Sequence, residues 1–291
     1  MQVAMVRGIY GKWKVPIYLN FDQKMTPEIL MDIIKKMHEA GYLIKAACSD
    51  MGGWNQETLE FHMKSLGYHI PLTQMKRIFF LADAPHCLKL TRNWLLDTGF
   101  VLSDGSIADK KPLEALVKLV SSPQNPLEVT SCYKLTEAHM KCEKTSRQSV
   151  RLAAQLLSHS TAVALQRYLP GDDPEAALRL SKVIGTINSW FDVFNSYILY
   201  STPLKSAYGT HLVEQDKCLD DMYHLMSTMH CGEKKFLQVF QKAIMISIKS
   251  LQMLRVELEL RFEKKFILTH RLNQDLLEIF FWPNPNKRWT S

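Results

Sequence analysis

Two carboxylates lie three residues apart near the end of the chain, at Asp275 and Glu278, just before the apolar pair Phe280 and Phe281. If this run is helical, both side chains share one face, because residues three apart are neighbours on a helix surface. Converging carboxylates are what a hard divalent cation requires. An exposed glutamate on an amphipathic helix is nevertheless common. The spacing alone leaves both interpretations open.

A further carboxylate, Asp50, follows the apolar run Leu43–Cys48 and precedes Gly52 and Gly53. At the end of a buried strand, this side chain would project from the edge of a sheet into a crevice. An aspartate before glycines also favours a simple turn. The residues alone favour neither interpretation.

The run Asp83–Asn93 places an acid, a histidine and basic residues close together. Lys89 and Arg92 are candidates to meet phosphates of a nucleic acid, a contact that gives affinity without reading sequence. We expect Asp83 and His86 to organise a turn between a strand and a helix through hydrogen bonds.

The elements that must position these residues begin with an α/β pattern. β-Branched and aromatic residues indicate a strand pair or one bent strand over Val3–Phe21. A helix should begin after Thr26 as its N-cap and stop at Gly41. Short strands are expected at Leu43–Cys48 and Ile78–Leu81. This order predicts a parallel pairing whose carboxyl ends meet at one rim.

From about Leu113 the apolar spacing is helical, as in Val150–Tyr168 and Lys234–Phe262, and no further strand is expected. We therefore predict an α/β protein whose partial sheet is interrupted by a large all-α insertion. The predicted domains are an α/β part over residues 1–112, the helical insertion over 113–265, and a returning acidic helix over 266–291.

Composition narrows the class of protein. With 291 residues and 46% hydrophobic content, the chain can bury a substantial core, and its net charge of +7 favours polyanionic partners. Six cysteines without a close pair, and no signal sequence or long apolar span, fit a reducing intracellular compartment and no membrane. Cys218, His224, His230 and Cys231 match no common zinc pattern.

Three runs together resemble the P-element transposase family: Cys48–Asn55, Asp83–Asn93 and Leu268–Phe281. The resemblance implies an RNase H-like core with a GTP-binding insertion, located in the nucleus. It implies Mg²⁺-dependent DNA cleavage and strand transfer at transposon ends. Asp50 and Glu278 would then be the catalytic carboxylates and metal ligands.

The helical part resembles the family's GTP-binding domain at Trp190–Ser196. The chain has no Walker-type loop, so side chains would hold the nucleotide. Asp192 or Asp275 can accept from the guanine edge, Asn195 can offer its amide, and Phe191 can stack. The alternative of equal weight is an amphipathic helix that buries its aromatic residues. The resemblance places Asp275 in the nucleotide pocket, so that it and Glu278 would join the two sites.

The resemblance also has gaps. The family carries a third carboxylate on a first strand upstream of Val6–Phe21, and neither Asp22 nor Asp32 is placed to substitute for it. We expect no THAP-type zinc module, because the available Cys and His residues do not form its ligand pairs, and we expect Pro283 to end the acidic helix. We therefore expect a transposase truncated at both ends or domesticated, with impaired catalysis.

Two alternatives remain. One is a non-catalytic regulator that binds DNA, GTP, a related transposase or a second copy of itself. The other is a decayed gene product, because loss of the first strand would expose an edge of the sheet.

Overall fold

The computed structural model describes residues 2–21, 25–50, 69–73, 76–121 and 135–274. The chain divides into two units, each assembled from separated segments. Unit 1 comprises Met1–Ala84, Val193–Asp216 and Ala243–Lys287, and unit 2 comprises Pro85–Asp192, Lys217–Lys242 and Arg288–Ser291. The predicted domain limits, 1–112, 113–265 and 266–291, stay a prediction.

Unit 1 opens with an antiparallel hairpin of β1 (Gln2–Arg7) and β2 (Lys14–Asn20), which confirms the expected strand pair. A second sheet has the order β3-β5-β4, from β3 (Ala46–Ser49), β4 (His69–Thr73) and β5 (Lys76–Ala82). β3 pairs with β5 in parallel, as the sequence predicts, and β4 pairs with β5 antiparallel.

Helix α1 (Pro27–Glu39) covers this sheet. Its start and end follow the sequence signals, since the Thr26 side chain accepts a hydrogen bond from the Ile29 amide and Gly41 takes a φ of +88°. Ile34 packs with Ile78 and Phe80 of β5 in a buried cluster. Burial of such side chains stabilises the fold by roughly 1.5–3 kcal/mol each.

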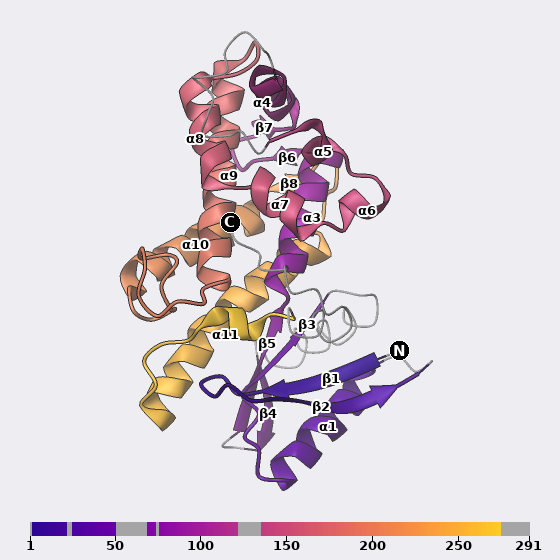
Figure 1. Cartoon of the computed structure of the whole chain (residues 1–291), viewed down its shortest axis with the longest axis vertical. Coiled ribbons are helices and arrows are strands. Elements are labelled where there is room, and N and C mark those ends of the chain that lie inside the picture. Colours follow the sequence, from indigo (N-terminus) through magenta and orange to yellow (C-terminus); the bar gives the residue numbers. More distant parts are fainter. Residues whose placement is uncertain (1, 22–24, 51–68, 74–75, 122–134, 275–291) are drawn as a thin grey trace. The chain divides into compact units, whose positions relative to one another are not determined.

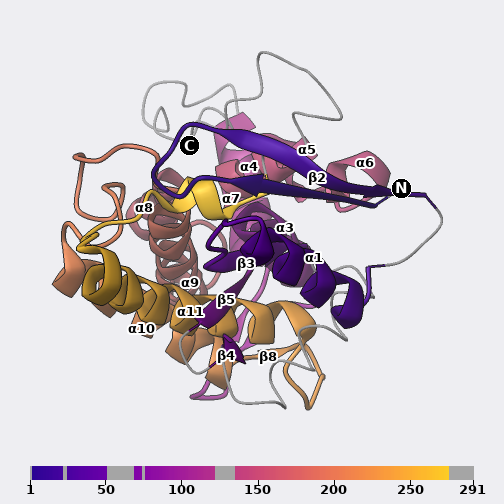
Figure 2. The same cartoon turned by 90° about the horizontal axis from the view of Figure 1, so that it is seen from below.

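The rest of unit 1 comes from distant sequence. It includes most of α11 (Val239–Phe262), the 3-10 turn η2 (Thr269–Leu272) and the loop after α9 (Pro174–Phe194). Ser247 of α11 accepts a hydrogen bond from the Ala82 amide at 2.8 Å, at the carboxyl end of β5. Figure 2 shows β3 between the β1–β2 hairpin and α11.

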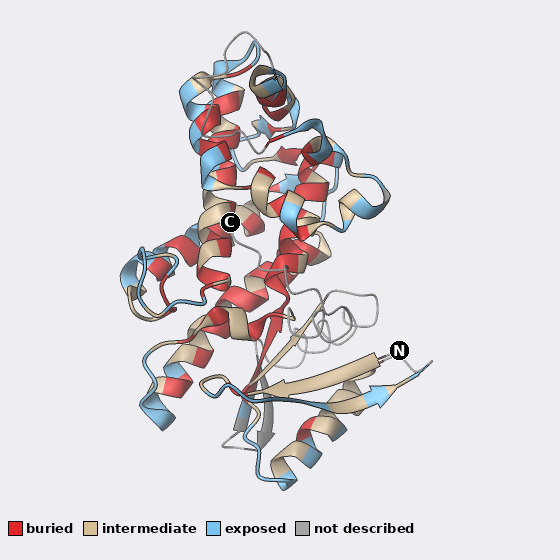
Figure 3. Cartoon of the chain, in the orientation of Figure 1, coloured by how far each residue is buried: buried red, intermediate tan, exposed pale blue. Residues whose placement is uncertain are grey.

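Unit 2 is mostly helical (Figure 1). Its helices are α3 (Ala84–Asp97), α4 (Lys111–Ser121), α5 (Glu137–Met140), α6 (Lys144–Arg147), α7 (Val150–Leu156), α8 (His159–Tyr168), most of α9 and much of α10 (Leu212–Thr228). Figure 3 shows buried residues along these helices. The side chains of Trp190 and Phe100 are among the largest fully buried ones.

Two sequence expectations fail in unit 2. A small sheet, in the order β7-β6-β8, joins β6 (Phe100–Val101), β7 (Ile107–Ala108) and β8 (His230–Cys231). Only β8 lies in the range 113–265, where no strand was expected, and the insertion is otherwise helical as predicted. Two-residue strands are too short to show alternation. The single helical pattern over Val150–Tyr168 is split into α7 and α8, since the Ser158 side chain caps α8.

The long helix expected at Lys234–Phe262 is confirmed from Val239 onward, as α11. Across the residues that the structure describes, no helix has both the length and the apolar character needed to span a bilayer.

Candidate functional site

Two aspartates leave neighbouring parallel strands at the same level. Asp50 follows Ser49 at the end of β3, and Asp83 follows Ala82 at the end of β5, where Ser49 and Ala82 are register partners. The Asp83 amide donates to the Ser49 carbonyl at 2.9 Å, which continues the pairing by one step. The rim predicted from the strand order therefore carries Asp50 and Asp83.

Asp83 is only 4% exposed, and its Oδ1 accepts a hydrogen bond from the Gln274 amide at 2.8 Å. The two residues are 191 positions apart in sequence. Gln274 immediately precedes Asp275, and Glu278 follows four positions later. Asp83 thus fixes the chain just ahead of the acidic run at the carboxyl end of β5. We call Thr269–Gln274 the junction segment.

The junction segment is also tied to the end of α9. The Thr269 hydroxyl donates to the Val193 carbonyl at 2.5 Å and accepts from the Ser196 amide at 3.0 Å. The Asn273 side-chain amide donates to Asn195 Oδ1 at 3.2 Å. Because Thr269 is 1% exposed and Asn273 6% exposed, water competes little for these bonds.

Arg271 ties the junction segment to the loop of the β1–β2 hairpin. One guanidinium nitrogen donates to the carbonyls of Ile9 at 2.9 Å and Gly11 at 2.8 Å, with a longer contact to Gly8 at 3.4 Å. Charge strengthens such hydrogen bonds. The segment is therefore held by the hairpin, by the end of α9 and by the end of β5.

His270 adds a hydrogen bond from its imidazole ring to the loop after α9. Its Nδ1 lies 3.0 Å from the Ser196 carbonyl and must be the donor, because a carbonyl oxygen only accepts. Burial lowers the pKa of His270 below its usual value, and the nearby Arg7 and Arg271 lower it further. The imidazole is therefore neutral near pH 7, which suits its place among cations.

Replacing Asp83 by alanine should free the start of the acidic run. The Gln274 amide would lose its acceptor at a half-buried position, at a cost of about 1–3 kcal/mol. Hydrogen exchange should show faster exchange at Gln274, with β1 and β2 unchanged. The control is Asp104→Ala, whose exposed carboxylate bonds only to Ser106 among the bonds described. Unchanged exchange at Gln274 would contradict this anchoring role.

The candidate nucleotide-binding residues Phe191 and Asp192 have different environments in the structure. Phe191 is 6% exposed and packs against Trp190, with ring centroids 6.2 Å apart, so the ring lies in the core as the packing interpretation expects. Asp192 is half-buried and its Oδ2 accepts from the Asn188 side chain at 3.1 Å. Burial of the Cys218 thiol raises its pKa to about 12, and the nearby charges of Asp221 and Asp192 raise it further.

Asn195 belongs to unit 1, where its side-chain oxygen holds Asn273 of the junction segment. Asp275 and Glu278 lie outside the described residues. Their roles in nucleotide and metal binding, like those of Phe191, Asp192 and Asn195, stay predictions.

The two candidate DNA contacts differ sharply in burial. Lys89 is half-buried and makes one long hydrogen bond, 3.4 Å, to the Gln148 side chain. Arg92 is 0% exposed, and its guanidinium donates to the carbonyls of Ser146 (2.8 Å), His139 (3.2 Å) and Lys141 (2.6 Å). Burial lowers the pKa of Arg92. Contact with a phosphate would require Arg92 to give up these bonds, so its assignment to DNA stays a prediction without geometric support.

Within the described part of the chain, no three His, Cys, Asp or Glu side chains lie close enough to hold a metal ion. The rim supplies Asp50 and Asp83, oxygen ligands of the kind that Mg²⁺ prefers, but one oxygen of Asp83 already holds Gln274. The donor set thus fits Mg²⁺ only with a further carboxylate. Sequence reasoning assigned Asp83 to a turn, although its place after a buried strand is the same signal that marked Asp50.

Two family models match the chain. One, described as "TNP-like, RNase H N-terminal domain", matches residues 1–63. The other, described as "TNP-like, GTP-binding insertion domain", matches residues 85–207. Together they match more than half of the chain, in the order that the sequence resemblance implies.

One curated protein and one solved structure are similar over nearly the whole chain. The "Transposable element P transposase" of Drosophila melanogaster is 34% identical over 287 residues, which cover 97% of this chain and 37% of that protein. The structure described as "Drosophila P element transposase strand transfer complex" is 32% identical with a TM-score of 0.87, over 99% of this chain and 65% of that one. The chain thus spans little more than a third of its curated relative. It is a P-element transposase-like protein, a homologue of the Drosophila P transposase, with an RNase H N-terminal domain and a GTP-binding insertion domain.

Proposed function

We propose that this protein binds DNA and guanine nucleotide and retains a weakened form of Mg²⁺-dependent DNA cleavage and strand transfer, acting in the nucleus on transposon ends. The observation that carries the proposal is the anchoring of the junction segment. Asp83 and Asn195 both hold this segment, one at the acidic rim and one at the end of α9. The similarity to a protein whose structure is described as a strand transfer complex supports DNA as the substrate.

In this proposal, Asp50 and Glu278 hold the cation. Gln274 is fixed four residues before Glu278, so a helix that starts there would carry Glu278 one turn from the rim. When bound, Mg²⁺ supplies a Lewis acid that polarises the phosphodiester and lowers the pKa of an attacking water. The protein's part is to hold the two carboxylates together on rigid strands and a clamped segment. Because one oxygen of Asp83 at the described rim already accepts from the Gln274 amide, we expect slow cleavage.

The cleavage test uses supercoiled plasmid with Mg²⁺ or Mn²⁺. We expect slow nicking by the parent chain, reduced at least a hundredfold in Asp50→Asn and in Glu278→Gln. Asp32→Asn is the matched control, because this carboxylate is more than half exposed and pairs with Lys36 on the surface of α1. Nicking that survives both substitutions would contradict the proposed site.

The nucleotide branch rests on the matched insertion domain, and its residues are those expected from the sequence. Asp192 is half-buried near the end of α9, where its carboxylate can accept from a guanine edge. Calorimetry with GTP should show binding that Asp192→Ala weakens about tenfold or more. The control is Glu175→Ala, an exposed carboxylate in the first turn of the same helix. Absence of heat with GTP would remove this branch.

The second candidate function is a regulator that binds DNA or a related transposase without cutting DNA. At the described rim, one oxygen of Asp83 is already used by the Gln274 amide, which favours this function over full activity. DNA binding by a chain that never nicks plasmid, with either metal, would select this function. Gel shifts at rising salt would show it as affinity that falls steeply with ionic strength.

A further inference from the structure

The outer face of α11 carries apolar side chains where a surface helix is normally polar. Leu251, Leu254 and Leu258 are buried and form the inner face of this helix. On the opposite face, Val256 is 49% exposed and Leu260 is 79% exposed. A helix that is apolar on two faces is usually covered on both. The outer face therefore has the character of a contact surface.

A groove of about 420 Å³ follows this outer face within unit 1, and we call it the α11 groove. Residues of α11 between Gln252 and Arg261 line it, together with Arg77, the second residue of β5. Residues 252–261 extend along the helix axis by about 14 Å, since an α-helix rises 1.5 Å per residue. The groove is thus long enough for about two turns of another helix.

The apolar residues of the groove have the spacing of a helix-packing seam. Met253, Val256 and Leu260 follow one another at intervals of three and four residues. Rows of this kind form the ridges that pack between the side chains of a neighbouring helix. An added strand would instead need free backbone groups, and those of α11 are bonded within the helix. The occupant that fits this face is an amphipathic helix.

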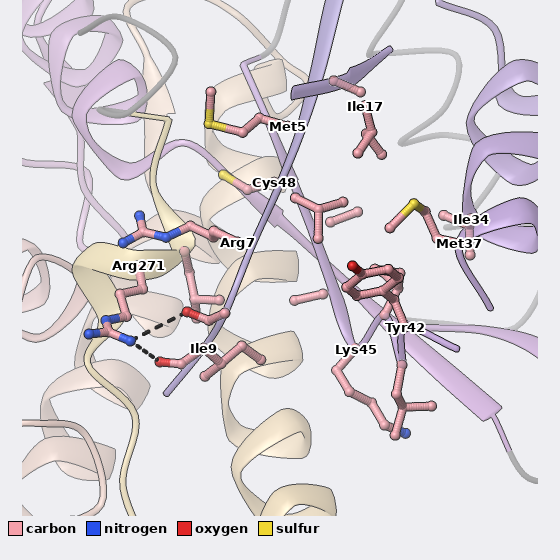
Figure 4. A pocket seen from close by; sticks show the side chains of 18 of the residues that line it. Met5, Arg7, Ile9, Ile17, Ile34, Met37, Tyr42, Lys45, Cys48 and Arg271 are labelled. Carbon is pink, nitrogen blue, oxygen red and sulfur yellow. Dashed lines mark hydrogen bonds between the residues drawn. The ribbon is translucent and has the colours of Figure 1, made fainter. Parts of the chain in front are cut away.

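The charges that line the groove select the chemistry of the occupant. Arg77 and Arg261 are both exposed. Glu257 is the one acid among the described residues that line the groove, and it is 8% exposed. Its carboxylate forms an ion pair with Lys45, which lines the larger cavity of unit 1 (Figure 4). The groove therefore presents net positive charge to an occupant.

This charge favours an acidic partner over a second copy of the chain. Glu259, which lies beside the groove on α11, is already paired with Arg255 at 2.9 Å. Two copies that met through this face would each bring an excess of positive charge, and like charges across an interface weaken binding. Carboxylates on the occupant would instead be attracted to the two exposed arginines.

We propose that the α11 groove binds an amphipathic, acidic helix of a partner protein. Leucine-type side chains of that helix lie along Met253, Val256 and Leu260, and its carboxylates pair with Arg77 and Arg261. Apolar burial in the centre and charge pairing at the rim are the usual parts of such an interface. The inference does not depend on DNA cleavage or on GTP binding, because the groove contains none of the residues assigned to either activity.

The probe is a fluorescein-labelled, hydrocarbon-stapled helix of about two heptads, with leucines on one face and glutamates beside them. Fluorescence anisotropy should show saturable binding that weakens as salt rises. Leu260→Asp should weaken binding at least tenfold, since burial of one leucine is worth more than a factor of ten in affinity. Val213→Asp is the matched control, because Val213 is 82% exposed in unit 1 but does not line the groove.

The charge contribution has its own pair of variants. Arg77→Ala should weaken binding about threefold and reduce its dependence on salt. Lys36→Ala, which removes an exposed cation of α1, should change neither quantity. A probe with glutamine in place of glutamate should bind the parent chain more weakly, and a probe with serine in place of leucine should show no saturable binding.

Methionine methyl signals in nuclear magnetic resonance spectra locate the bound probe. Met253 lines the groove, whereas Met222 and Met226 are fully buried in unit 2. The Met253 signal, identified by its loss in Met253→Leu, should shift with the affinity that anisotropy gives. The signals of Met222 and Met226 should stay in place.

Several outcomes would overturn the proposal. They are no saturable binding of the probe up to about 100 µM, equal binding to the parent and to Leu260→Asp, or equal binding of the serine probe. A concentration-dependent dimer that Leu260→Asp dissociates would assign the face to a second copy instead. A DNA duplex that displaces the probe, and that binds Leu260→Asp at least tenfold more weakly, would assign it to nucleic acid.

Discussion

Arg92→Ala is expected to destabilise unit 2 by about 3 kcal/mol or more. The substitution removes hydrogen bonds to the carbonyls of His139, Lys141 and Ser146 and leaves them without their donor. A hydrogen bond to a charged group contributes about 1.5–3 kcal/mol, and the guanidinium here is 0% exposed. Denaturant unfolding followed by Trp fluorescence would measure the loss.

Lys89→Ala is the matched control on the same helix. Lys89 is half-buried, but its single 3.4 Å hydrogen bond to the Gln148 side chain is exposed to water, so its loss should change stability by no more than about 0.5 kcal/mol. If both residues instead contacted DNA, both substitutions would weaken DNA affinity and neither would change the free energy of unfolding. If Arg92→Ala folds as well as the parent, the buried network does not hold the segment from His139 to Ser146.

Glu257→Ala should cost unit 1 about 3–5 kcal/mol. Glu257 of α11 forms a buried ion pair with Lys45, the residue that precedes β3, and the two are 8% and 5% exposed. Removing the acid leaves the Lys45 ammonium buried without its carboxylate, which is the expensive way to break such a pair. Arg261 Nε also lies 3.7 Å from the Glu257 carboxylate, but the Arg261 side chain is 43% exposed. Loss of Glu257 therefore costs Arg261 little, because water can solvate its charge.

The double variant Lys45→Met with Glu257→Leu separates charge from packing. Replacing both partners by apolar residues of similar size should recover most of the lost stability, because no charge stays buried. Glu259→Ala, on the same helix with a more exposed carboxylate paired to Arg255, should cost less than about 1 kcal/mol. A double variant no more stable than Glu257→Ala would show that packing, not charge, sets the cost.

Local signals account for what the sequence predicts correctly. The hairpin, the N-cap at Thr26 and the stop at Gly41 depend on neighbouring residues, and the parallel pairing of β3 with β5 follows from the order of the elements along the chain. Strand β8 escapes prediction because its two residues carry no period, and its pairing with Phe100 and Val101 is distant in sequence.

The candidate site shows where sequence reasoning stops. The sequence does not show whether a basic residue such as Arg92 faces a phosphate or donates to three buried carbonyls. Only the fold distinguishes these two environments. Asp83 reads as a turn residue because its partner, the Gln274 amide, comes from the far end of the chain.

The central claim is that the clamped junction segment brings Glu278 to the rim that carries Asp50. Mn²⁺ binding, followed by electron paramagnetic resonance, tests it most directly in the parent, Asp50→Asn, Glu278→Gln and the double variant. Our account predicts that each single substitution weakens the tightest site at least tenfold and that the double variant loses little more, because both residues serve one ion. Additive losses, or single variants that bind Mn²⁺ like the parent, would contradict it.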